Sequence, residues 1–193
     1  FAELWAGVQE AAVWLAERTE LGDRIAIVSD NRPEVVVLMY AAPMAGVIAM
    51  FANTRLIESE INDLIADVTP VLVLRTPELD ALLPSGALRR QFLSPDRSGA
   101  PVETDTAWII HTSGTTGRPK GVFRAAPVVT PQAMYALRGY DDTSVQLCAG
   151  PAYHAAPLAF DVRAAMGAGC PLVFMDKWDS EHVLATIAER RVT

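Results

Sequence analysis

The chain has 193 residues, of which 51% are hydrophobic and 20% charged, a composition typical of a globular protein with a substantial core. Its formal net charge of −7 argues against a nucleic-acid partner, because nucleic-acid phosphates require a basic stripe that this sequence lacks. An anionic ligand would therefore have to be bound by local hydrogen-bond donors rather than by the overall field of the protein.

The first part of the chain alternates between helical and strand-like apolar patterns. We expect helices over residues 3–17, from about Pro33, and over 58–66, and strands over residues 24–28, 47–51 and 71–74. This alternation predicts an α/β fold, layered, with a largely parallel sheet flanked by helices.

An uncharged, largely apolar stretch over residues 35–52 is long enough to be tested as a membrane span, since it would measure about 27 Å as a helix against a bilayer core of about 30 Å. Pro43 and Gly46 interrupt it. We therefore expect a buried helix followed by a strand, and no transmembrane segment.

The most informative motif follows a short apolar strand predicted over residues 107–111. The ten residues from Thr112 to Gly121 read Thr-Ser-Gly-Thr-Thr-Gly-Arg-Pro-Lys-Gly, and they combine glycines that allow close backbone approach with hydroxyl donors and the cation of Lys120. The spacing excludes a Walker phosphate loop, in which a serine or threonine follows the lysine. We interpret the motif as a phosphate-binding loop, the alternative being a polar turn between strands.

The elements around this motif continue the same pattern. Residues 84–104 lose periodicity and are expected to form a solvated connector. Beyond the motif we expect helices over residues 131–137 and 158–166, strands over 145–148 and 172–175, and a final helix capped by Asp179 or Ser180 with an apolar stripe of Val183, Leu184 and Ile187. The two cysteines, Cys148 and Cys170, lie in apolar surroundings, so we expect buried thiols in a reducing cytoplasm.

The motif resembles the phosphate-loop signature of the adenylate-forming superfamily, which includes acyl-CoA synthetases, peptide-synthetase adenylation domains and luciferases. Further segments similar to acyl-CoA synthetases occur in order: Gly22-Asp23-Arg24, Asn31-Arg32-Pro33-Glu34, Ala45-Gly46-Val47, Asn53-Thr54-Arg55-Leu56 and Pro151-Ala152-Tyr153-His154-Ala155-Ala156-Pro157. The resemblance implies an incomplete N-terminal domain over residues 1–193, with a first lobe at about 22–140 and second-lobe pieces at 1–21 and 141–193.

The resemblance also implies the site. The residues matching ATP-contacting positions are Thr112, Ser113, Gly114, Thr115, Thr116, Gly117 and Lys120. Lys120 and His154 are the catalytic candidates, His154 because its motif lines the acyl pocket in this family. Each has an alternative interpretation. Lys120 could be a surface charge or part of a structural ion pair, and His154 could be a histidine whose hydrogen bonds are made within a turn. We expect no functional role for His111, His182, Asp141, Asp142, Asp161 or Arg163.

The implied activity has two steps. A carboxylic acid, for which the motifs favour a fatty acid, reacts with ATP to form an acyl-adenylate and pyrophosphate, and coenzyme A then forms the thioester. Mg²⁺ is expected with ATP. The residues with which this family binds adenine, ribose and the metal match nothing in this chain, so no metal ligand can be assigned. We therefore expect this chain alone to be inactive. The segment 123–127 departs from the family pattern. The alternative functions are a non-catalytic nucleotide-binding module, another adenylate-forming ligase, or a phosphotransferase that would release ADP. The sequence does not determine the oligomeric state, and a homo-oligomer is one possibility.

Overall fold

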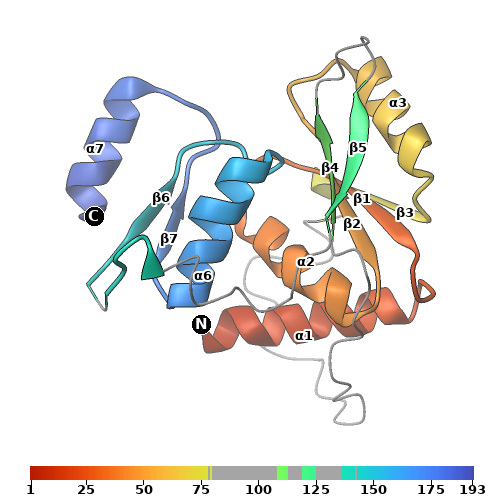
Figure 1. Cartoon of the computed structure of the whole chain (residues 1–193), viewed down its shortest axis with the longest axis horizontal. Helices are drawn as coiled ribbons and strands as arrows, with labels where there is room; N and C mark the ends of the chain where they lie inside the picture. Colours follow the sequence, from red (N-terminus) through yellow and green to blue (C-terminus); the bar gives the residue numbers. More distant parts are fainter. Residues whose placement is uncertain (78, 80–107, 113–118, 125–135, 142) are drawn as a thin grey trace. The chain divides into compact units, whose positions relative to one another are not determined.

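The computed structural model describes residues 1–77, 79, 108–112, 119–124, 136–141 and 143–193 (Figure 1). The chain divides into two compact units. One comprises Phe1–Ser29 and Pro33–Val128, and the other comprises Asp30–Arg32 and Val129–Thr193.

The first unit is built on a five-stranded sheet in the order β3-β1-β2-β4-β5. Its strands are β1 (Arg24–Val28), β2 (Ile48–Phe51), β3 (Leu72–Arg75), β4 (Trp108–Thr112) and β5 (Lys120–Arg124). Neighbouring strands are parallel except for β4 and β5, which are antiparallel. The sheet confirms the predicted strands over residues 24–28, 47–51, 71–74 and 107–111, while β5 was not predicted.

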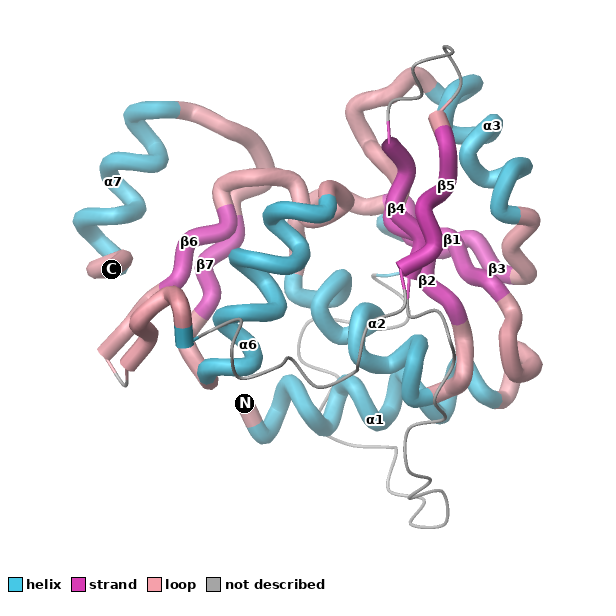
Figure 2. Tube along the Cα trace, in the orientation of Figure 1, coloured by secondary structure: helices cyan, strands magenta, loops and turns pink. Residues whose placement is uncertain are grey.

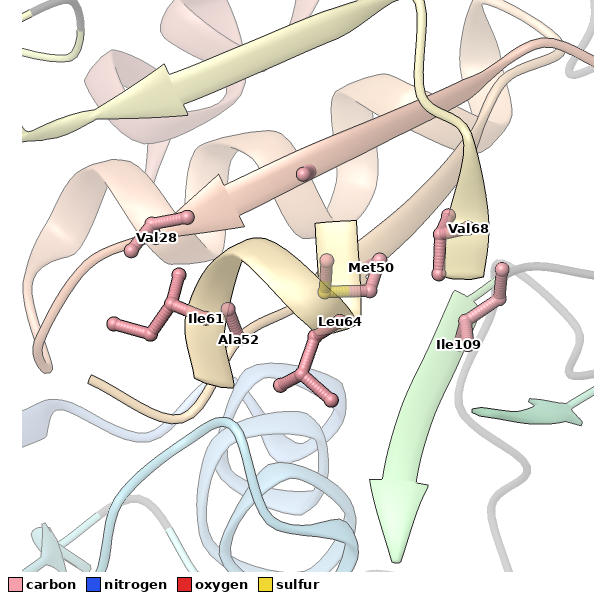
Figure 3. Close-up of a cluster of buried hydrophobic side chains, with 8 residues drawn as sticks. Val28, Met50, Ala52, Ile61, Leu64, Val68 and Ile109 are labelled. Carbon is pink, nitrogen blue, oxygen red and sulfur yellow. The ribbon is translucent and has the colours of Figure 1, made fainter. Parts of the chain in front are cut away.

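In the described part of the chain, the helices α2 (Pro33–Met44) and α3 (Glu58–Val68) cover this sheet, and α1 (Ala2–Ala16) packs on α2. On one face, Ile61, Leu64 and Val68 of α3 pack against the strands in a cluster shown in Figure 3. The strand residues of that cluster are Ala26, Val28, Met50, Ala52 and Ile109.

The opposite face of the sheet is also covered. Because side chains alternate along a strand, Ile25 and Ile27 point away from α3, yet both are buried. Figure 2 shows α2 on that side, with α1 beyond it. A strand buried on both faces has a continuous apolar sequence, which is why β1 could be predicted from its residues alone.

The apolar stretch over residues 35–52 forms the buried helix and strand that we expected, α2 and β2. Gly46 separates them with a φ of 74°, a left-handed conformation that glycine adopts without strain. In the part of the chain that the structure describes, no helix is long and apolar enough to cross a membrane.

The second unit contains a two-stranded parallel sheet of β6 (Gln146–Cys148) and β7 (Leu172–Phe174). The helix predicted over residues 158–166 begins as a π-helix, η1 (Pro157–Arg163), and continues as α6 (Ala164–Ala168). Helix α7 (Ser180–Arg190) begins as predicted, since the side chain of Asp179 accepts a hydrogen bond of 2.8 Å from the His182 N–H.

The apolar stripe expected on α7 is only partly buried. Val183 is buried, but Leu184 is 67% exposed and Ile187 is 37% exposed among the described residues. Helical spacing identifies residues on one side of a helix without showing that anything covers them.

The connector over residues 84–104 and nearly all of the helix over 131–137 lie outside the described residues. Helix α1, which we expected to join a second lobe, lies in the first unit because its buried residues pack on α2. The lobe boundaries belong to a larger domain and stay a prediction.

Candidate functional site

Two of the predicted phosphate-binding residues stand opposite each other at the end of a β-hairpin. Strand β4 ends at Thr112 and β5 begins at Lys120, and these two residues are paired in the antiparallel register. Directly opposed residues of an antiparallel pair present their side chains on the same face. Both residues are exposed, so the Thr112 hydroxyl and the Lys120 ammonium are accessible to a ligand. Residues 113–118, which include Ser113, Gly114, Thr115, Thr116 and Gly117, lie outside the described residues.

The hairpin is anchored in the sheet. Residues Trp108, Ile109 and Ile110 of β4 are buried, and β4 pairs with β2 on one side and β5 on the other. Backbone pairing with β5 therefore holds Thr112, and the buried residues Trp108 to Ile110, which also pair with β2, anchor the strand that leads to it.

Close packing at the base of the hairpin favours glycine at position 121. A Cβ atom there would lie 3.1 Å from Cγ2 of Ile109, 3.3 Å from Nε2 of His111 and 3.5 Å from Oδ2 of Asp67. The first two distances are tighter than ordinary van der Waals contact, so even alanine would have to displace a neighbour.

His111, for which we expected no role, lies at this base, paired with Gly121. Its side chain is only 6% exposed, and Nε2 lies 3.5 Å from Oδ2 of Asp67 on α3. Among the described residues, Nδ1 has no hydrogen-bond partner. Burial lowers the pKa of His111, and the nearby Asp67 carboxylate opposes that shift. The ring is therefore neutral at pH 7.

The second candidate, His154, lies in a turn of the second unit formed by residues 150–154. The backbone N–H of His154 donates to the Pro151 carbonyl at 3.0 Å, and the His154 carbonyl accepts from the N–H of Leu158 at 3.1 Å. Its ring is exposed and meets the ring of Tyr153 edge-on, with centroids 4.8 Å apart. The turn therefore presents an accessible imidazole just before η1.

Besides the Cys148 thiol, which donates to the Gly150 carbonyl at 3.3 Å, the 150–154 turn is tied down by the side chain of Asn31. Its Nδ2 donates to the Gly150 carbonyl and to the Met175 carbonyl, both at 2.8 Å, and its Oδ1 accepts from the Ala152 N–H at 2.7 Å. The sequence marked Asn31 only as part of a family-like segment. No local pattern indicated these contacts, because the partners lie 119 to 144 residues away.

Two aspartates of this unit, Asp161 and Asp141, are hydrogen-bonded to neighbouring side chains. Asp161 accepts from Arg138 at 3.3 Å and from Gln146 at 3.2 Å, and burial raises its pKa against the opposing effect of Arg138. Asp141 accepts hydrogen bonds from Thr143 and Ser144, which lower its pKa. These hydrogen bonds tie both carboxylates to neighbouring residues of the same unit.

The two cysteines are buried free thiols, as predicted. Burial, with a smaller contribution from Asp161, raises the pKa of Cys148 to about 12, and burial also raises the pKa of Cys170. A thiol with a raised pKa is a poor nucleophile near neutral pH. Within the described ranges, no three His, Cys, Asp or Glu side chains form a metal-binding group.

Comparison with known proteins matches the whole chain to one family. The family described as "AMP-binding enzyme" matches residues 1–193. A 2-succinylbenzoate–CoA ligase of Enterococcus faecalis is 28% identical over 200 residues, covering 96% of this chain and 41% of that protein. The long-chain-fatty-acid–CoA ligase FadD13 of Mycobacterium tuberculosis is 29% identical over 196 residues, covering 89% of this chain and 38% of that protein.

Among solved structures, the inhibitor-bound N-terminal domain of FACL13 from Mycobacterium tuberculosis matches with a TM-score of 0.77 and 26% identity. The match covers 99% of this chain and 54% of that one. It confirms the predicted α/β fold with a largely parallel sheet flanked by helices. The chain spans less than half the length of the two curated relatives described above.

Proposed function

The chain belongs to the family of AMP-binding enzymes, as its resemblance to the adenylate-forming superfamily predicted, and from this premise we propose that it is part of an acid–CoA ligase. The relatives named above are CoA ligases with different acids in their names, which supports a carboxylic acid as substrate. We propose a fatty acid as the first substrate class to test, because the motifs at residues 53–56 and 151–157 favour one.

The proposed reaction forms and breaks one bond in each step. A carboxylate oxygen attacks the α-phosphorus of ATP, and the bond to pyrophosphate breaks. The sulfur of coenzyme A then attacks the acyl carbon of the adenylate, the bond from that carbon to the adenylate oxygen breaks, and AMP leaves while the thiol loses its proton.

The observation that carries this proposal is the pairing of two exposed residues, Thr112 and Lys120, across the end of an anchored hairpin. Negative charge develops on the pyrophosphate as its bond to the α-phosphorus breaks. A hydroxyl donor and an ammonium on one face of the hairpin can stabilise that charge at fixed positions. In this proposal Ser113, Gly114, Thr115, Thr116 and Gly117 complete the loop around the phosphates.

We assign the carboxylate side of the reaction to His154. Its imidazole is exposed, lies at the start of a helical segment and is held against Tyr153. A histidine in this setting can donate a hydrogen bond to the carboxylate or the adenylate. This assignment rests on the family-like motif at residues 151–157 together with the accessibility of the ring.

Mg²⁺ would accompany ATP and neutralise phosphate charge. The described residues offer no cluster suited to hold it, so no ligand for Mg²⁺ is assigned in this chain. A cytoplasmic location is proposed because both cysteines are free thiols.

Carboxylate-dependent exchange of labelled pyrophosphate into ATP tests the proposal. The assay uses the protein that carries this chain and a panel of fatty, aromatic and amino acids. We expect exchange only when a carboxylic acid other than an amino acid is present, with AMP as the nucleotide product once coenzyme A is added. ATP binding without exchange would indicate a non-catalytic nucleotide-binding module, and exchange with amino acids alone would indicate another adenylate-forming ligase.

A further inference from the structure

We propose that Asn31 is a positioning residue for the carboxylate side of the reaction, acting through the 150–154 turn that presents His154. The inference rests on the proposed function, because it gives His154 the substrate-facing role described above. Asn31 itself contacts backbone groups of the protein rather than substrate.

The Asn31 amide has its main hydrogen-bonding capacity committed to three backbone groups. Both Nδ2 protons are donated, to Gly150 and Met175, and Oδ1 accepts from Ala152, at 2.7 to 2.8 Å. These distances are at the short end of the normal N–H···O range. A primary amide can make two donations and an acceptance in one plane, which a carboxylate or a hydroxyl cannot reproduce.

Two of the three bonds hold the turn on either side of Pro151. Gly150 and Ala152 flank Pro151, which has no N–H to donate. Asn31 holds the carbonyl on one side of that proline and the N–H on the other. The Pro151 carbonyl then accepts the N–H of His154 at 3.0 Å. Asn31 therefore holds the residues on both sides of Pro151, and the Pro151 carbonyl in turn holds the backbone of His154.

Asn31 also ties the turn to the neighbouring strand. Gly150 follows the end of β6 and Met175 follows the end of β7, and the Met175 N–H donates to the Cys148 carbonyl at 3.1 Å. A two-stranded sheet is weak by itself. The Asn31 amide joins the carboxyl ends of both strands, the edge at which sites commonly form in parallel sheets.

Close packing on the other side of the turn leaves the turn little room to adjust if the Asn31 hydrogen bonds are lost. A Cβ atom on Gly150 would lie 2.7 Å from Cγ of Pro157, so the turn is already in close contact with the first residue of η1. Loss of the Asn31 bonds would free Gly150 and Ala152 while Pro157 restricts where they can go. We expect the turn to shift and take His154 with it.

The decisive comparison uses Asn31→Ala, Asn31→Asp and the control Asn62→Ala, whose side chain is exposed on α3, in the protein that carries this chain. Misplacement of a substrate-positioning group by about 1 Å can cost roughly a hundredfold. We therefore expect kcat/KM for the carboxylic acid to fall by roughly a hundredfold in both Asn31 variants, with the KM for ATP and all parameters of Asn62→Ala within about twofold of the parent. Asn31→Asp keeps the size of the side chain, so its loss of activity would report the two lost donations rather than lost packing.

Coupling to His154 separates positioning from a general loss of structure. If Asn31 acts through His154, then adding Asn31→Ala to His154→Ala should cost little more than His154→Ala alone. Independent, multiplicative losses in the double variant would overturn the inference, as would equal changes in the KM values of ATP and the carboxylic acid.

A readout that needs no catalysis tests the hydrogen bonds themselves. Amide hydrogen exchange, followed by mass spectrometry, should be faster in Asn31→Ala for peptides spanning the 150–154 turn and unchanged for peptides of β1 and β2. Unchanged exchange in the turn would overturn the inference even in an active enzyme. Faster exchange with normal carboxylate kinetics would overturn the positioning role and leave the proposed function standing. A parent protein without carboxylate-dependent exchange would overturn the proposed function, and the positioning role with it.

Discussion

The hairpin of β4 and β5 and the turn at residues 150–154 present their candidate residues by different physical means. The hairpin holds Thr112 and Lys120 through backbone pairing between β4 and β5, and the buried part of β4 is paired in turn with β2. The turn that presents His154 is held by two hydrogen bonds to the Asn31 side-chain amide, which also donates to the Met175 carbonyl. Positions set by many backbone bonds tolerate side-chain changes, whereas a position set by one side chain does not.

The two regions are therefore vulnerable to different changes. In the hairpin, the exposed functional side chains can be removed without loosening the structure, so activity and stability should separate. In the turn, the same kind of change should alter structure and activity together.

Replacing Lys120 with alanine should reduce carboxylate-dependent pyrophosphate exchange by roughly a hundredfold, about 3 kcal/mol of transition-state stabilisation. The ammonium is exposed, so the midpoint of thermal unfolding should stay within about a degree of the parent. The matched control is Lys177→Ala, an exposed lysine of the second unit. A loss of activity in both variants, or a loss of stability in the first, would contradict the separation.

Replacing Gly150 with alanine should destabilise the protein by about 1 to 3 kcal/mol, because the new Cβ would lie 2.7 Å from the stiff ring of Pro157. Urea denaturation measures the loss. Adding Pro157→Ala removes the opposing ring atoms and should recover part of the stability, as a double-mutant cycle would report. A single variant as stable as the parent would show that the turn is not closely packed.

A smaller cost, about 1 kcal/mol, is expected for Gly121→Ala, whose Cβ would lie 3.1 Å from Ile109 and 3.3 Å from His111. Without those neighbours the same change would stabilise a strand, because alanine loses less backbone entropy on folding than glycine. The sign of the change in unfolding free energy therefore decides whether the base of the hairpin is packed as described. A gain in stability would contradict the description.

The smallest effect concerns pH. Burial lowers the pKa of His111 below its ordinary value of 6.5, so the unfolded chain binds this proton more readily than the folded one. The contribution of His111 to stability is fully present above pH 6.5 and declines as the pH falls through the window below it, at up to about 1.4 kcal/mol per pH unit. In His111→Phe, the difference in unfolding free energy between pH 7.5 and 5.5 should shrink. An unchanged or larger difference would contradict a buried, neutral ring.

Most of the fold could be predicted from the residues because apolar runs mark buried strands. Strand β1 is buried on both faces and reads as Arg-Ile-Ala-Ile-Val, and the final helix carries its own cap in Asp179. Strand β5 escaped prediction because Lys120–Arg124 contains a glycine and ends in charge, and Phe123 is 55% exposed. The π-helical start at Pro157 also escaped, since an apolar pattern does not reveal which backbone bonds form.

The candidate site was predictable only in part. The chemistry of Thr112 and Lys120 follows from residue types and spacing, and the pairing of these two residues follows once β5 is seen. The packing of His111 against Gly121 and Asp67 could not be predicted, because Asp67 comes from a helix more than forty residues earlier. The role of Asn31 could not be predicted either, because hydrogen bonds between distant segments leave no local signature in a single sequence.

The most direct test of the central claim follows the oxygen of the substrate. The hairpin is proposed to hold the phosphates of ATP while a carboxylate oxygen attacks the α-phosphorus. With a carboxylic acid labelled with ¹⁸O and an excess of coenzyme A, the protein that carries this chain should therefore release AMP containing one labelled oxygen. Label in inorganic phosphate, with ADP as the nucleotide product, would instead indicate transfer of the γ-phosphoryl group and would contradict the account.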